Sequence, residues 1–434
     1  MQTADTPKTT SNAVITFLTK VMAIFGIFGI AVLLGNAFNL IGWSYIVQIR
    51  YYLLMGAACI SASLLYFIQY RERPIAFKYY TVFITLWPFF VLLSASFQGG
   101  TLQEEIIRIL TWTYVGAFFM LFYQFRIDEK MILWVLALYA LITASIQIMQ
   151  QIDPLYAIFG GDPEDIGDVV LSGERNGLAR FFVGSYHIQM LMMCFFWSKF
   201  LRTFRIYWGA LSALLLVSVY LYLTKQILIS TLFTLALSFF MIKGRKTTIF
   251  ACVVGLISIV ALAIFWDDLF GEMIQDSKDD SFSHGIRLEF IAWIMEYNLT
   301  DPIGVLFGHG VSSPWFQELI HLLYYPSDIG FFGEAIYYGW LWALAYFYAV
   351  YRILITYRQR IPLYLRLFVI CSGIISVFIF PYRNRIELFN WICMIYICSL
   401  YVDRKSDMVI ERDLLLDKLE KPESQEETAL CCSQ

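Results

Sequence analysis

Long apolar stretches alternate with short polar connections along most of the chain. Each stretch has about 17–23 residues, which as a helix is long enough to cross the roughly 30 Å hydrocarbon core of a bilayer. Lipid offers no hydrogen-bond partner to a bare backbone, so a run of this length must be helical where it crosses. The pattern predicts an all-α, polytopic integral membrane protein with about twelve transmembrane helices, at 14–34, 51–69, 79–97, 106–123, 131–149, 181–197, 206–223, 226–242, 247–266, 329–350, 364–381 and 386–402.

The amino-acid composition agrees with an integral membrane protein and excludes a water-soluble globular protein. Apolar residues (Ala, Val, Ile, Leu, Met, Phe, Trp, Tyr and Cys) make up 59% of the 434 residues, and charged residues make up 15%. Soluble domains are typically about half apolar and about a quarter charged. The net charge of −3 gives no reason to expect a nucleic-acid partner. None of the eight cysteines falls in a loop that we place outside, so no outer disulfide is expected.

Lysine and arginine are divided unevenly between the two sets of connections. One set of short loops holds fifteen of them, whereas the alternate set holds eight. Because cytoplasmic loops carry the positive excess, the first set is predicted to be cytoplasmic, together with both termini. Residues 1–402 then form a single transmembrane domain with long outer loops at 150–180 and 267–328, the second between helices nine and ten, and 403–434 form a polar cytoplasmic tail.

The second outer loop has its own secondary-structure pattern. After an acidic start, apolar residues recur at helical spacing over 286–297, which predicts an amphipathic helix. Ser313-Pro314 is a helix start with a capping hydroxyl, and this helix is expected to extend over 314–325. Loops longer than about 15 residues are uncommon unless they are functional or disordered. The periodic faces favour a functional loop.

Six basic residues lie on the predicted outer side, where lysine and arginine are normally scarce. One explanation is interfacial: a long basic side chain reaches up to headgroup phosphate. The other is a site for a diphosphate, because arginine pairs with phosphate through a two-pronged fork. Six cations at one face favour the diphosphate site: Arg175, Arg180, Lys225, Arg287, Arg383 and Arg385.

Two residues near the end of the second outer loop are candidates for acid–base chemistry. His321 lies on the short helix expected at 314–325, and Glu334 lies in the first turns of the span at 329–350. An acid in a span must face the protein interior and is a functional candidate. His187, within the span at 181–197, is interpreted as a hydrogen-bonded packing residue. The loop histidines His284, His309 and His321 lack the spacing of a metal site.

Several short segments between about 180 and 350 carry motifs of small, basic and acidic residues at the starts of predicted helices and in the second outer loop. The main one is an Arg, Trp, Pro and Gly-x-Gly run in the second outer loop. The others are a histidine followed by a Gly and Glu segment, an Arg and Gly segment that opens a middle span, and a polar helix start. In order, the residues are Arg287, Trp293, Pro302, Gly308 and Gly310; His321, Gly330, Gly333 and Glu334; Arg180 and Gly184; and Thr224, Lys225 and Gln226. Together these segments resemble the O-antigen polymerase and O-antigen ligase superfamily.

The resemblance implies a metal-independent glycosyltransferase of the membrane-embedded C-type fold, without a cofactor. Such an enzyme polymerises lipid-linked repeat units of an O-antigen, capsule or exopolysaccharide. It transfers a glycan from undecaprenyl pyrophosphate to a sugar hydroxyl on the periplasmic side of the bacterial inner membrane. Arg180, Arg287 and Lys225 are then expected to bind pyrophosphate, with the other outer arginines next, and His321, or else Glu334, to be the base. A chain-length regulator protein is an implied partner.

Two other functions compete with the polymerase. A ligase would pass finished polymer to lipid A–core, but Leu322 follows His321 where ligases of the family usually carry Asn, Ser or Gln, and Lys225 stands in place of an arginine. A lipid-linked oligosaccharide flippase or other secondary transporter would show internal repeats and ionisable residues at mid-membrane. The two halves show no repeat and the ionisable residues cluster at one face, so the polymerase is favoured.

Overall fold

The computed structural model describes residues 24–32, 34, 56–57, 61, 64, 68, 75–101, 115–152, 171–175, 178–181, 185–222, 224–242, 248–250, 253, 281–298, 301–310, 329–382 and 385–420. Over these residues the fold is helical apart from one two-stranded hairpin, and the predicted all-α class is confirmed. The predicted spans at 14–34, 51–69, 106–123 and 247–266 lie partly or wholly outside the described residues.

Three of the described helices are long and apolar enough to cross a membrane. They are α3 (Lys78–Phe97), the Glu129–Met149 part of α5 (Glu129–Ile152) and the Arg385–Asp403 part of α17 (Arg385–Glu420). Shorter apolar helices cover Val115–Gln124, Ile206–Tyr220, Gln226–Met241, Trp340–Thr356 and Leu363–Ile375. Each of these helices overlaps a predicted span, so the described part of the chain has several helices of the membrane-spanning kind.

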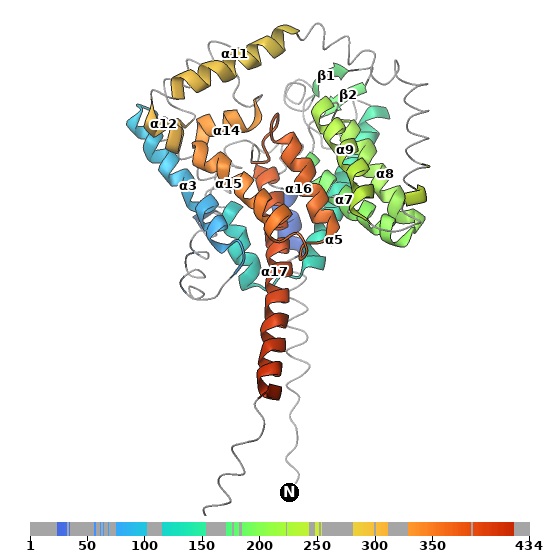
Figure 1. The fold of residues 1–434 in the computed structure, drawn as a ribbon. Helices are drawn as coiled ribbons and strands as arrows, with labels where there is room; N and C mark the ends of the chain where they lie inside the picture. The colour runs from blue at the N-terminus through green and yellow to red at the C-terminus, as the bar shows by residue number, and fades with distance from the viewer. Residues whose placement is uncertain are drawn as a thin grey trace, which may run out of the picture.

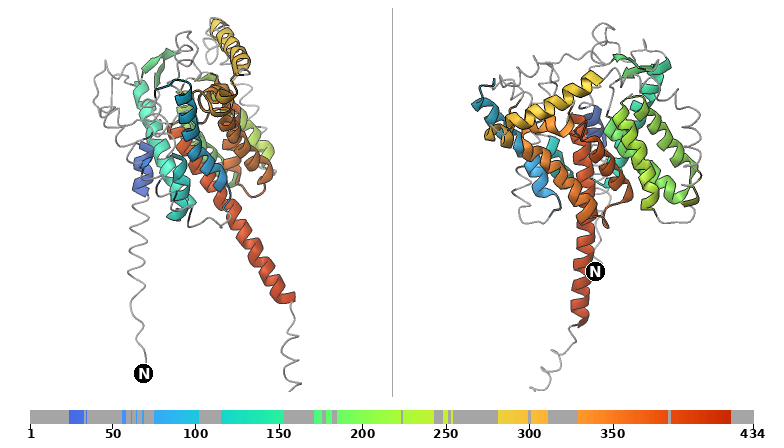
Figure 2. Two further views of the ribbon diagram at one scale, coloured as in Figure 1. Left: turned by 90° about the vertical axis from the view of Figure 1, so that its left-hand side faces the viewer. Right: turned by 45° about the horizontal axis from the view of Figure 1, so that its top comes forward.

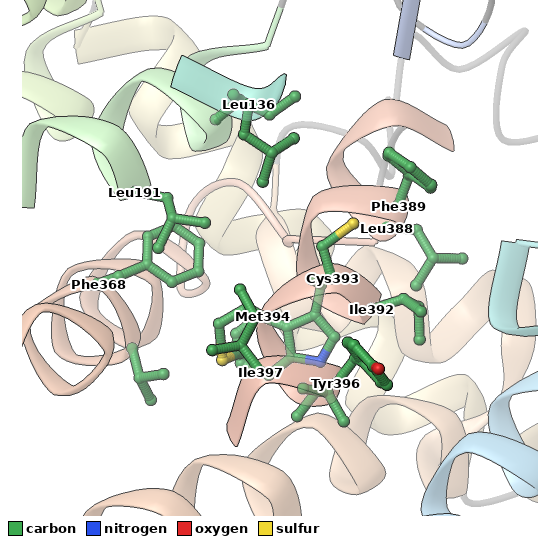
Figure 3. Packing of buried hydrophobic residues seen from close by; sticks show 14 of the residues in the cluster. Leu136, Leu191, Phe368, Leu388, Phe389, Ile392, Cys393, Met394, Tyr396 and Ile397 are labelled. Atoms are coloured by element: carbon green, nitrogen blue, oxygen red, sulfur yellow. The ribbon is translucent and has the colours of Figure 1, made fainter. Parts of the chain in front are cut away.

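Helix α17 lies in the middle of the bundle, and its first half is buried on every face. All residues from Ile386 to Ser399 are buried, as expected of a helix that is apolar all round. Figure 3 shows how its side chains pack with others from α5, α7 (Tyr186–Thr203) and α16 (Leu363–Ile375), among them Leu136, Leu191 and Phe368. The helix continues through Glu420, beyond the predicted start of the tail at 403, and its second half projects from the bundle (Figures 1 and 2).

Helices α7, α8 (Ile206–Tyr220) and α9 (Lys225–Met241) form an antiparallel group beside α5 and α16. The predicted separation of two spans near Thr224 is confirmed. Helix α7, however, differs from the span predicted at 181–197. Ser185 caps its start by accepting the backbone N–H of Ile188 at 3.1 Å, and Phe181 belongs to a strand instead. The apolar pattern missed its end because Lys199 and Arg202 occupy the last turns.

The span predicted at 329–350 is two helices, and this is the main correction to the sequence-based fold. Helix α14 (Gly330–Tyr338) ends at Gly339, and α15 (Trp340–Tyr351) begins there and continues into the π-helical segment η3 (Arg352–Thr356). Gly339 has φ 84° and ψ 157°, a conformation open almost only to glycine. Hydropathy cannot detect this break because the residues on both sides are apolar.

The end of the bundle opposite the projecting half of α17 carries short elements. Strands β1 (Leu171–Arg175) and β2 (Leu178–Phe181) pair antiparallel within the predicted outer loop 150–180. Helix α11 (Ser281–Asn298) extends across this end, and α12 (Pro302–Phe307) lies beside α3 (Figure 1). The amphipathic helix predicted at 286–297 is thus confirmed as α11. The helix predicted at 314–325 lies outside the described residues.

Candidate functional site

The elements that carry the predicted cations are found at one end of the bundle. The hairpin β1–β2 and α11 lie there (Figure 1), and α17 begins there. Helix α9 also begins there, because α7 starts a few residues after β2 and short connections make α7, α8 and α9 antiparallel. Arg175 lies in β1, Arg180 in β2, Lys225 at the start of α9, Arg287 in α11 and Arg385 at the start of α17.

Several of the predicted site residues, or their side chains, lie outside the part of the chain that the structure describes. His321 and Arg383 lie outside the described residues, as do the side chains of Arg175, Arg180 and Lys225. Arg287 and Arg385 are partly exposed. The structure therefore places five of the six predicted cationic positions by backbone, and it does not test whether their charges converge on one ligand.

Helix α12, in the segment with the family resemblance, has a well-defined start. The carboxylate of Asp301 accepts the backbone N–H groups of Ile303 and Gly304, each at 3.1 Å, and Pro302 occupies the first turn. This is the arrangement that satisfies the bare N–H groups of a helix start. At the other end of α12, the ring of Phe307 stacks on Trp87 of α3 with ring centroids 5.4 Å apart. The cap fixes the start of α12, and the stacking of Phe307 on Trp87 attaches its other end to α3.

The Gly308–Gly310 loop docks on the break between α14 and α15. A Cβ atom on Gly308 would overlap the backbone of Tyr337, and one on Gly339 would overlap the carbonyl of Leu306, so only glycine permits the two segments to meet. The helix break leaves carbonyl groups without partners in their own helix. The N–H of His309 donates to Ile336 O at 2.8 Å, and the N–H of Gly310 donates to Tyr337 O at 3.1 Å. Loop and break therefore complete each other's hydrogen bonding.

The side chain of His309 lies inside this junction. It is 1% exposed, its Nδ1 lies 2.6 Å from Gln98 Oε1, and Asp301 Oδ2 is 3.7 Å away. Burial lowers the pKa of His309 to about 4, although the charge of Asp301 acts in the opposite direction. His309 is thus neutral near pH 7 and ties the loop to the end of α3. Sequence reasoning considered it only as a metal ligand, and the flanking glycines were the signal of its structural role.

Glu334 lies on α14, four residues before the helix ends, and is 7% exposed. The prediction that it faces the protein interior is confirmed. Helix α14 contacts α3, α12 and α15, so Glu334 belongs to the same end of the bundle as the Gly308–Gly310 loop. Whether it acts with His321 is a prediction that the described residues do not test.

A second polar cluster was not anticipated, and it joins the first turns of α7 and α17. His187 Nδ1 lies 2.8 Å from Glu387 Oε2, and the hydroxyl of Ser185 donates to the same oxygen at 2.7 Å. His187 and Glu387 are 1% and 2% exposed. The interpretation of His187 as a hydrogen-bonded interior residue is confirmed. Its partner Glu387 was missed, although an acid inside a predicted span is a signal that could have found it.

Another set of hydrogen-bonded polar side chains joins α5, α7 and α8. Gln189 donates to Thr143 and to Gln147 of α5, at 3.3 and 3.2 Å, and Gln147 also accepts from Ser218 of α8. These contacts hold α5, α7 and α8 together through hydrogen bonds within an apolar interior, where an unmet polar group is costly. Among the described residues, no group of three or more His, Cys, Asp or Glu side chains is arranged to hold a metal ion.

Comparisons with known proteins do not extend this picture. No protein-family model matches the chain, and no curated protein or solved structure is significantly similar to it.

Proposed function

We propose that the chain is a membrane-embedded glycosyltransferase that polymerises lipid-linked polysaccharide repeat units. One observation carries the proposal. The segments with the family resemblance, Asp301–Gly310 and Gly330–Glu334, belong to one folded junction, because His309 and Gly310 hydrogen-bond to the end of the helix that carries Glu334. The same end of the bundle holds α11, the β-hairpin and the start of α17, the elements on which the candidate cations lie.

The proposed reaction is a transfer between two lipid-linked substrates. The bond between the donor glycan and undecaprenyl pyrophosphate breaks, and its electron pair leaves with the pyrophosphate. An acceptor hydroxyl oxygen forms the new bond, and its proton passes to a base. Arg180, Arg287 and Lys225 stabilise the charge that develops on the pyrophosphate, with Arg175, Arg383 and Arg385 beside them. His321 is the proposed base and Glu334 the second choice.

The proposal includes a membrane setting. About twelve helices cross the bacterial inner membrane with both termini in the cytoplasm, and the large outer loop between helices nine and ten faces the periplasm. The six cations then lie on the side where lipid-linked repeat units are joined. A chain-length regulator is the proposed protein partner. The partly exposed position of Arg287 on α11 is compatible with contact to a substrate at this end.

The experiment uses purified protein in liposomes with undecaprenyl-pyrophosphate-linked repeat units, and the product ladder is read on a gel. Arg287→Ala should abolish the ladder, and Arg287→Lys should restore it poorly because lysine lacks the two-pronged fork. Arg358→Ala is the matched control, since Arg358 is an exposed arginine between η3 and α16 and should leave the ladder unchanged. A normal ladder from Arg287→Ala would remove Arg287 from the site.

A secondary transporter or flippase is the second candidate, and two observations favour it. His187 and Glu387 form a buried polar pair inside the bundle, and α14–α15 is a discontinuous helix. Both features are typical of transporters. In the same liposomes, a transporter would move intact lipid-linked units across the bilayer and produce no ladder.

A further inference from the structure

The surface of helix α11 carries two separate apolar faces. Phe290 and Ile294 are each 1% exposed and pack with Ile329 and Ile336 near and within α14. Leu288 and Met295, seven residues apart and so on one side of the helix, are 59% and 47% exposed. The first face is explained by packing on α14, whereas no element that the structure describes packs on the second.

Helix α12 divides its side chains in the same way. Phe307 stacks on Trp87 and Phe90 of α3, whereas Ile303 and Leu306 are 52% and 44% exposed. Two neighbouring helices at this end of the bundle therefore each present large aliphatic side chains outward. Scattered apolar residues on a surface need no explanation, but a contiguous set marks an interaction site.

Helix α3, against which α12 packs, also exposes apolar side chains. Helix α3 is a candidate membrane span, and its last turns expose Phe90, Leu93 and Phe97. In a membrane span such a face is covered by lipid. Because α12 packs against the same end of α3, its exposed side chains extend this lipid-facing surface toward the headgroups. Figure 1 shows α11 continuing across the end of the bundle next to α12.

The charges on α11 fit this position. Glu289 and Glu296 are exposed and, at a spacing of seven residues, share a side of the helix that differs from that of Leu288 and Met295. A helix with one apolar side and one charged side lies in the plane of the membrane interface, with the apolar side among the upper acyl chains. If α11 were surrounded by water, its second apolar face would stay exposed to water, which is unfavourable.

We propose that α11 and α12 lie in the interface of the bilayer, with Leu288, Met295, Ile303 and Leu306 inserted at the boundary between headgroups and acyl chains. These helices form an apolar collar, defined by those four residues, that continues the lipid-facing side of α3. The occupant of the collar is bilayer lipid. The inference concerns where the helices lie and does not depend on the glycosyltransferase proposal.

The test places a nitroxide label on a genetically encoded ketone amino acid, one position at a time, in protein reconstituted in phosphatidylethanolamine–phosphatidylglycerol vesicles. Collisions with oxygen, which concentrates in lipid, are compared with collisions with a water-soluble nickel chelate. Labels at Leu288 and Ile303 should give an oxygen-to-nickel collision ratio several-fold higher than labels at Glu289 and Glu296. The acidic positions are matched controls because Glu289 is the neighbour of Leu288 on the same helix.

Three results would overturn the proposal. The first is an equal ratio at Leu288 and Glu289, which would place α11 in water. The second is shielding of Leu288 only after lipid-linked repeat units are added, which would make a substrate chain the occupant. The third is a broadened spectrum from label–label contact between copies, which would identify a protein interface. Thermal unfolding of each labelled protein verifies the fold, and the ratios are interpretable whether or not the protein has transferase activity.

Discussion

Replacing Gly339, at the break between α14 and α15, by alanine should destabilise the protein. Gly339 ends α14 and begins α15 with φ 84° and ψ 157°. A Cβ atom at this position would overlap the carbonyl group of Leu306, at the close approach of α12. The alanine must therefore change its backbone conformation or move α12 away, and either movement disturbs the junction that holds Gly308–Gly310.

The magnitude follows from the two consequences of the substitution. A residue other than glycine in this backbone region costs of order 1–3 kcal/mol. Moving the segments apart weakens the hydrogen bonds from His309 N to Ile336 O, 2.8 Å, and from Gly310 N to Tyr337 O, 3.1 Å. Each is worth about 0.5–1.5 kcal/mol net. The free energy of unfolding should therefore fall by about 2–6 kcal/mol.

The assay is thermal unfolding of the purified protein in detergent, followed by intrinsic tryptophan fluorescence. The matched control is Gly373→Ala within α16, where a Cβ atom would meet nothing within 4 Å. In a helix interior this change is stabilising by about 0.5–1 kcal/mol. The two variants should thus shift the unfolding midpoint in opposite directions. A Gly339→Ala protein that unfolds at the wild-type temperature would refute the close approach of α12 to the helix break.

Two further predictions concern buried polar groups. Glu387→Ala removes the acceptor shared by the His187 ring and the Ser185 hydroxyl. Each buried group left without its partner costs about 1–3 kcal/mol, so the free energy of unfolding should fall by roughly 2–6 kcal/mol. Glu387→Gln keeps an acceptor oxygen and should lose less, and an unfolding midpoint of Glu387→Ala equal to that of wild type would contradict the prediction. Because the pKa of His309 falls from about 6.5 to about 4 on folding, the unfolded chain binds the extra proton as the pH drops from 7 to 5. The free energy of unfolding should then decline by about 2 kcal/mol over that range from this residue alone. His309→Gln, which lacks the titrating ring, should show a smaller decline. If His309→Gln and wild type lost the same stability between pH 7 and 5, the lowered pKa of His309 would be excluded.

Local patterns in the sequence were sufficient to predict the class of protein and the positions of many helices. Apolar runs of bilayer length predict membrane helices, and the helix at 286–297 followed from apolar residues at helical spacing. The separation of α8 from α9 followed from polar residues near Thr224. These features could be predicted because burial in lipid or in a helical bundle demands the same apolar pattern wherever the helix lies. The burial of Glu334 was predictable for the same reason.

Tertiary structure decided three features that the sequence did not predict: the helix break at Gly339, the identity of the partner of His187, and the second apolar face of α11. The break exists because the Gly308–Gly310 loop arrives to complete the carbonyl hydrogen bonds of α14, from about 30 residues earlier in the chain. His187 and Glu387 are 200 residues apart and meet only because α7 and α17 begin side by side. Hydropathy reports what one segment prefers, namely lipid or water. Which groups then meet is determined by backbone approach and hydrogen-bond complementarity between distant segments, and no window along the chain contains both partners.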